Sequence, residues 1–228
     1  MKSNKARVIP RAKYRLISRA QLVTLSSRVL RLKILAREVA TISISVTILG
    51  LSSRAQFYLP ISHIPFTLQT MILIYLTLLL GKRAWRAVLA YLICGLAGLP
   101  VFALGGGPWY VFSPTFGYLL GFLLASLIGG LIIKDRVLLP LRTLLISATA
   151  SMASIYIMGA LYLAIWLTLL RGFSVHEAIV RAILVGVLPF MIWDALKAYI
   201  AVLLYKATVK LLVYIGTCRY SREQYKRY

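Results

Sequence analysis

Two oppositely charged side chains, Asp194 and Lys197, lie three residues apart inside an apolar stretch near the end of the chain. On a helix this spacing places both on one face, about 4.5 Å apart along the axis. At the centre of a bilayer each charge would cost about 2.5–3.5 kcal/mol on insertion scales, so the pair needs a compensating environment. The two residues could neutralise each other as a buried ion pair, or they could face a polar ligand. Their types and spacing leave both alternatives open.

The composition indicates an integral membrane protein. Of the 228 residues, 61% are hydrophobic and 14% are charged, whereas soluble domains have about 45–50% apolar and about 25% charged residues. This length fits one compact helical bundle. A net charge of +22 would suggest nucleic-acid binding in a soluble protein, but here the charges lie between and beyond the apolar blocks. We therefore expect contact with anionic membrane lipid and no nucleic-acid binding.

Six apolar segments are candidates to span a bilayer, which takes about 20 residues of helix. The third segment contains Gly95, Gly98 and Pro100, so we expect it to be kinked or broken. A shorter apolar stretch at 209–215 is expected to continue the last helix. The sequence predicts an all-α membrane protein, with a six-helix bundle over residues 34–216. The predicted spans are residues 34–51, 66–80, 85–104, 114–133, 144–170 and 183–204.

Basic segments flank this bundle at both ends. Residues 1–33 contain ten Lys and Arg and no acid, and apolar residues between 14 and 32 recur at helical spacing. We interpret residues 1–33 as an amphipathic segment on the cytoplasmic membrane surface, and residues 217–228 as a basic cytoplasmic tail. Basic residues also concentrate in alternate loops between the spans. The positive-inside rule then places both termini in the cytoplasm of a multi-pass protein of the cell membrane.

This topology places two unusual loops on the outer side, at residues 51–65 and 105–113. Both combine proline or glycine with aromatic residues, which favours an ordered pocket wall over a loose linker. Asp194 and Lys197 are predicted to lie in the outer half of the last span, on the side of these loops. An acid and a base beneath aromatic loops indicate a binding site for a small molecule.

The sequence favours a binding protein over an enzyme. An intramembrane enzyme that used Asp194 and Lys197 as acid and base would need a second acid or a histidine at membrane depth. Within the predicted spans the only candidate is Glu38, near a membrane edge. Cys94 and Cys218 lie in an apolar segment and a basic tail, and nothing else supplies ligands at the spacing of a zinc site. We expect neither a cofactor nor a metal ion.

Three blocks of sequence keep the order and spacing of a known family across about residues 35–205. On these blocks the chain resembles the BioY family, the biotin-specific substrate-binding (S) components of energy-coupling factor (ECF) transporters. The first block matches P-x-T-x-Q-T, the second matches G-x-x-G-L-P-V-F and P-T-x-G-Y-L-x-G-F, and the third matches P-F-x-x-x-D-x-x-K. They fall on residues 65–70, on residues 95–102 and 114–122, and on Pro189, Phe190, Asp194 and Lys197.

The resemblance implies biotin as the ligand. A carboxylate such as Asp194 can accept from the ureido N–H groups of biotin, while Lys197 either donates to the biotin carboxylate or holds Asp194 ionised. Gln69 either contacts the ligand or caps a helix. An S component for another vitamin and a solitary biotin facilitator are the alternatives. The expected ligand-binding residues are Asp194, Lys197, Tyr91, Trp109, Thr115, Tyr118 and Gln69.

The resemblance also implies protein partners. Ala36 and Ala40 form a small-x-x-x-small pair in the first predicted span, which allows another helix to approach closely. In the family such a pair docks the transmembrane coupling subunit, although packing within the bundle would use the same pattern. The chain shows no nucleotide-binding loop of its own. ATP hydrolysis is therefore expected to reside in two separate ATPase subunits.

Overall fold

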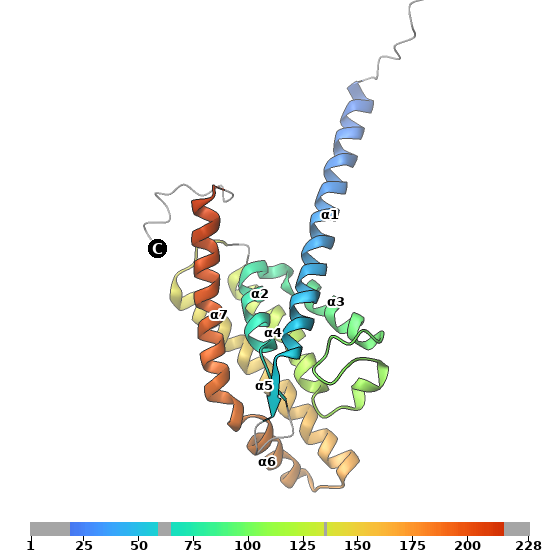
Figure 1. Ribbon diagram of the computed structural model, residues 1–228, viewed down its shortest axis with the longest axis vertical. Coiled ribbons are helices and arrows are strands. Elements are labelled where there is room, and N and C mark those ends of the chain that lie inside the picture. The colour runs from blue at the N-terminus through green and yellow to red at the C-terminus, as the bar shows by residue number, and fades with distance from the viewer. Residues whose placement is uncertain (1–18, 59–64, 135, 217–228) are drawn as a thin grey trace, which may run out of the picture. The chain divides into compact units, whose positions relative to one another are not determined.

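The computed structural model describes residues 19–58, 65–134 and 136–216 and is mostly helical (Figure 1). The first 18 residues of the predicted amphipathic segment, and the predicted tail at 217–228, lie outside the described residues. The elements in chain order are α1 (Arg19–Arg54), β1 (Gln56–Tyr58), β2 (Pro65–Thr67), α2 (Gln69–Leu80), η1 (Gly81–Arg83), α3 (Ala84–Leu96), η2 (Pro108–Phe112), α4 (Phe116–Ile133), α5 (Leu141–Arg171), α6 (Val175–Gly186) and α7 (Leu188–Tyr214).

α1 is one continuous helix of 36 residues. The described part of the predicted amphipathic segment therefore runs into the first predicted span without a break. Contacts divide the chain into two compact units, residues 1–40 and residues 41–228, and α1 runs through their boundary. The placement of residues 1–33 on the cytoplasmic membrane surface stays a prediction.

In the part of the chain that the structure describes, three helices are long and apolar enough to cross a bilayer. They are residues Leu30–Arg54 of α1, α4 and α5, and α6 with α7 qualifies as one further span bent by 42°. α2 and α3 have only 12 and 13 residues, against about 20 for a helix that spans alone. The predicted count of six spans is therefore not confirmed, and the orientation of the termini stays a prediction.

The third predicted span, 85–104, is broken, as the sequence suggests. α3 ends at Leu96, and Gly98 adopts a φ of 108°, which a residue with a side chain rarely adopts. The chain then folds back so that Phe102 packs on Gly95, where an added Cβ would lie 2.0 Å from the phenylalanine Cζ. Glycine at 95 thus allows the loop after α3 to cover that helix.

α4 and α5 pack closely because small residues recur every fourth position on α4, at 117, 121, 125 and 129. A Cβ at Gly121 would lie 2.8 Å from the Ile155 Cα, so the two backbones approach directly. Buried hydroxyls complete this contact: Ser147 donates to the Gly129 carbonyl and Ser151 to the Ala125 carbonyl, each at 3.1 Å. This tight pair forms one wall of the region where the charged side chains lie.

Two departures from the predicted all-α bundle shape this region. β1 and β2 form an antiparallel hairpin between α1 and α2 (Figure 1), in which Phe57 pairs with Phe66. The last predicted span, 183–204, is interrupted at Val187, because Pro189 favours a helix start and α7 begins there. α7 continues to Tyr214, which confirms the expected extension of the last helix.

Candidate ligand-binding site

A cavity lies between the hairpin, α2, α4, α5 and α7, all within residues 41–228. Its space not filled by atoms is about 600 Å³, including the part that opens to the outside. Its lining includes the predicted residues Gln69, Thr115, Tyr118, Asp194 and Lys197, together with Phe66, Thr67, Thr70, Tyr110, Phe122, Tyr156, Gly186 and Phe190.

The predicted acid and base form a buried ion pair at one end of this cavity. Asp194 is 5% exposed and Lys197 is 6% exposed. The Lys197 Nζ lies 2.5 Å from the Asp194 Oδ1, across one turn of α7. Their spacing in sequence therefore does bring the two charges together, and both line the cavity. The pair provides charged polar atoms inside an otherwise largely apolar enclosure.

Two hydroxyl groups from other helices also hold the Asp194 carboxylate. Tyr156 on α5 donates to Oδ2 at 2.7 Å, and Thr70 on α2 donates to Oδ1 at 3.1 Å. Both hydroxyls keep an oxygen lone pair that can accept a further hydrogen bond. A ligand N–H that approached this end of the cavity would thus meet a carboxylate and two hydroxyl oxygens.

The Lys197 ammonium is fully engaged by the protein. Besides Asp194, it donates to the Thr67 carbonyl at 2.7 Å and to the Thr70 hydroxyl at 3.2 Å. These three acceptors match the three N–H donors of a lysine. The ammonium also lies 3.6 Å from the centre of the Phe66 ring, within cation–π range. Lys197 is thus placed to fix Asp194 and to tie α7 to the start of α2.

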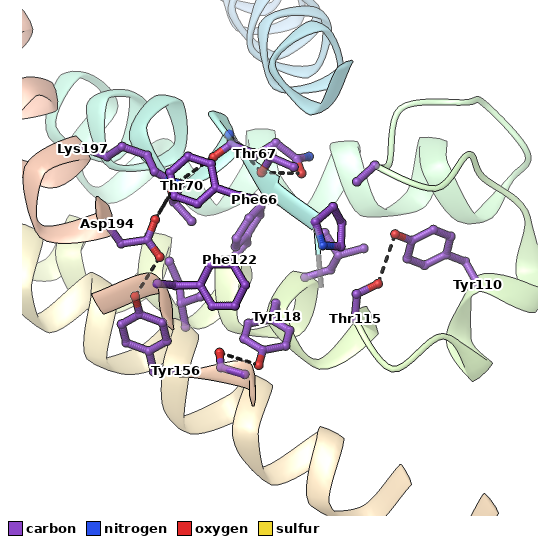
Figure 2. Close-up of a pocket in the computed structure, with 17 residues that line it drawn as sticks. Phe66, Thr67, Thr70, Tyr110, Thr115, Tyr118, Phe122, Tyr156, Asp194 and Lys197 are labelled. Carbon is purple, nitrogen blue, oxygen red and sulfur yellow. Dashed lines mark hydrogen bonds and ion pairs between the residues drawn. The ribbon is translucent and has the colours of Figure 1, made fainter. Parts of the chain in front are cut away.

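A second polar group lies at the opposite end of the cavity, where α4 begins (Figure 2). The Tyr110 hydroxyl and the Thr115 hydroxyl are 3.2 Å apart, and the Ser113 hydroxyl is 2.8 Å from that of Thr115. Thr115 is the N-cap residue of α4, but its side chain makes no capping hydrogen bond. Its hydroxyl is therefore part of the cavity wall and not a support of the helix.

Between the two polar ends the cavity is mainly aromatic. Figure 2 shows Phe66, Phe122 and Tyr118 between the Asp194 end and the Thr115 end. The Tyr118 hydroxyl donates to the Gly186 carbonyl at 2.9 Å, which links α4 to the break between α6 and α7. The arrangement suits an elongated ligand with a polar group at each end and an apolar body.

The described lining of the cavity includes neither Tyr91 nor Trp109, although both were predicted to contact the ligand. Tyr91 is fully buried behind the lining, where its hydroxyl accepts from the Gln69 amide at 2.5 Å and donates to the Val101 carbonyl at 3.1 Å. Trp109 is 79% exposed in η2. Gln69 does line the cavity, and it does not serve as a capping side chain for α2.

Three residues that contact the pair or line the cavity were not predicted from the sequence: Tyr156, Thr70 and Phe66. Thr70 and Phe66 lie within the block matching P-x-T-x-Q-T, which is a signal that could have found them. Tyr156 lies in the middle of a long apolar helix, 38 residues before Asp194. No spacing rule relates these two positions, because their contact depends on the packing of α5 against α7.

The chain is similar in sequence to one family of known proteins. The model of the BioY family matches residues 20–213. The biotin transporter BioY of Thermotoga maritima is 35% identical over 68% of this chain and 86% of its own length. A probable biotin transporter BioY from Pyrococcus horikoshii is 35% identical over 74% of this chain and 94% of its own length.

A solved structure shares the fold. It is a crystal structure of the S-component for biotin from an ECF-type ABC transporter, and it superposes with a TM-score of 0.61. The match covers 78% of this chain and 93% of that chain, at 19% sequence identity. With the family match extending from residue 20 to residue 213, nearly the whole described chain is accounted for. The chain belongs to the BioY family.

Proposed function

We propose that this chain is the biotin-binding S component of an ECF transporter, which captures biotin on the outer side of the cell membrane. The observation that carries the proposal is the cavity with the Asp194–Lys197 pair at one end and a hydroxyl group at the other. Biotin has a polar ureido ring and a carboxylate at opposite ends of an apolar body. The two polar ends and the aromatic centre of the cavity match these three parts.

The ureido ring is proposed to bind at the Asp194 end. Its two N–H groups need acceptors, and the Asp194 carboxylate and the Tyr156 hydroxyl oxygen lie together there. A hydrogen bond to a charged acceptor contributes about 1.5–3 kcal/mol, more than one to a neutral acceptor. Lys197 acts indirectly, since its three N–H groups already contact Asp194, Thr67 and Thr70. It holds the carboxylate in place.

The biotin carboxylate is proposed to bind at the Thr115 end. The hydroxyls of Tyr110 and Thr115 line the cavity there, and each can turn its hydrogen toward an anion. The Ser113 hydroxyl bonds that of Thr115. A carboxylate accepts hydrogen bonds only, so it avoids Asp194 and favours this donor-rich end. The two ends of the ligand are thereby distinguished by charge.

Thr115→Val tests this orientation, because it removes the hydroxyl and keeps the shape of the side chain. We expect biotin affinity to fall about tenfold, which corresponds to about 1.4 kcal/mol. The affinity for biotin amide, which lacks the negative charge, should change much less. Calorimetry on purified protein measures both ligands. Thr115→Ser is the control that keeps the hydroxyl, and an equal loss for biotin and its amide would contradict the proposed orientation.

The function itself is tested by identifying what the purified protein holds. We expect mass spectrometry of small molecules released from the full chain to detect biotin, and calorimetry to give one biotin per chain. The physical reason is that the cavity and its buried ion pair offer a matching ligand contacts that a detergent solution does not. If the protein instead released a different vitamin, and calorimetry detected no heat of biotin binding, that vitamin and not biotin would be the substrate.

The proposed partners are a transmembrane coupling subunit and two ATPases, which together would deliver biotin inward. The exposed positions of Ala36 and Ala40 on α1 support the coupling contact. A pair of small residues one helical turn apart lets a partner helix approach the α1 backbone closely. The basic loops support cytoplasmic termini, and therefore a cavity that opens outward.

A further inference from the structure

An open groove runs along the outer surface of α5, away from the biotin cavity. Its space, including the open side, is about 1030 Å³. Among the residues that the structure describes, those lining the groove all lie in the first half of α5, and none of them lines the biotin cavity. They comprise Arg142 and Thr149, with the apolar residues Leu141, Leu145, Ile146, Ala150 and Ala153. The proposed biotin function does not use this groove.

The groove has the length of one lipid leaflet. From residue 141 to residue 153 a helix rises about 18 Å, and half of a hydrocarbon core is about 15 Å. Larger side chains form one end and the small side chains of Thr149, Ala150 and Ala153 form the other. The groove can therefore take an extended apolar chain lying along α5.

Positive charge lies at the end of the groove where α5 begins. Arg142 lines the groove, and both Arg142 and Arg136 are exposed. Lys134, at the end of α4, is exposed too. Asp135, between the two basic residues, lies outside the described residues. By the positive-inside rule this end faces the cytoplasmic leaflet, where anionic lipids are attracted to basic residues.

We infer that this groove binds one acyl chain of an anionic phospholipid, with the lipid phosphate at Arg142. An apolar groove of leaflet length with a cation at one end is complementary to such a lipid. A second protein is a poorer fit, because stable protein interfaces involve about 20–30 residues a side and this groove is lined by one stretch of α5. This lipid would thus occupy a specific site on α5, unlike the other lipids that surround the protein in the bilayer.

Photochemical crosslinking of the full chain in vesicles tests the site. Phosphatidylcholine vesicles would carry a trace of phosphatidylglycerol with a photoreactive group in its acyl chain, and matched vesicles would carry the same group on phosphatidylcholine. We expect phosphatidylglycerol to label residues 141–153 preferentially. Arg142→Gln should reduce that labelling about fivefold, the factor for about 1 kcal/mol per basic residue at an anionic surface. Arg171→Gln, an exposed arginine at the other end of α5, is the matched control.

A second variant tests the contribution of the groove's shape separately from that of the Arg142 charge. Thr149→Leu with Ala153→Leu should fill the groove and remove the preference of this segment for phosphatidylglycerol over phosphatidylcholine. The exposed Ala207→Leu on α7 is the control for added volume and should change nothing. Equal labelling of the unaltered chain by both lipids would overturn the proposal. So would undiminished phosphatidylglycerol labelling of Arg142→Gln, or a preference for phosphatidylglycerol that survives Thr149→Leu with Ala153→Leu. Crosslinks between two copies of the chain through residues 141–153 would overturn it too, because the occupant would then be protein.

Discussion

Asp194→Asn is expected to weaken biotin binding at least about tenfold, or about 1.4 kcal/mol. Asparagine keeps the size of the side chain but removes the charge that strengthens hydrogen bonds from the ureido N–H groups. It also leaves the Lys197 ammonium buried without its counterion, and breaking a buried pair in this way costs about 3–5 kcal/mol of stability. Calorimetry and thermal unfolding of the same purified variant should therefore both show a loss.

Because Asp194→Asn lowers stability and binding together, a second variant has to separate them. Asp194→Asn combined with Lys197→Met removes both charges, and replacing a buried pair by apolar groups is often neutral for stability. We expect this double variant to unfold near the wild-type temperature and still to bind biotin weakly. Tyr75→Phe, which loses a hydrogen bond to Thr208 on α7 outside the cavity, is the control for a local defect. Wild-type affinity in the double variant would mean that the pair is only structural.

Features that depend only on residues close together in the sequence could be predicted from it. The Asp194–Lys197 contact follows from their spacing on one helix turn, and the structure places them 2.5 Å apart. The end of α3 follows from the local effects of Gly95, Gly98 and Pro100 on the backbone. Pro189 carried a similar signal for the break before α7, which the prediction of one uninterrupted span passed over.

Features that depend on packing between helices could not be obtained in this way. Tyr156 reaches Asp194 only because α5 packs on α7, and an isolated tyrosine in an apolar helix gives no sign of such a contact. The presence of an aromatic residue likewise does not determine whether its side chain points into the cavity. Trp109 projects outward and Tyr91 lies behind Gln69, whereas Tyr110, one residue after Trp109, lines the cavity. The short α2 and α3 are apolar enough to suggest spans but too short to qualify alone.

The coupling contact gives the other large expected effect. Replacing Ala36 and Ala40 together by Leu should abolish co-purification of the coupling subunit and leave biotin affinity unchanged. Two leucines on the exposed small-residue face of α1 would hold a partner helix away from the backbone, and contacts of this type depend on close approach. Pull-down of a tagged coupling subunit from membranes measures the association, and calorimetry on the isolated chain measures biotin binding.

Ile34→Phe is the control for this prediction, because it adds volume to α1 on roughly the opposite side of the helix from Ala36 and Ala40. Ile34 is 52% exposed, so the larger ring can be accommodated without repacking a core. We expect the Ile34→Phe chain to co-purify with the coupling subunit as the unaltered chain does. Survival of co-purification in the double leucine variant would place the docking face elsewhere. Loss in both variants would instead mean that α1 tolerates no added bulk, and the small residues would then have no special role.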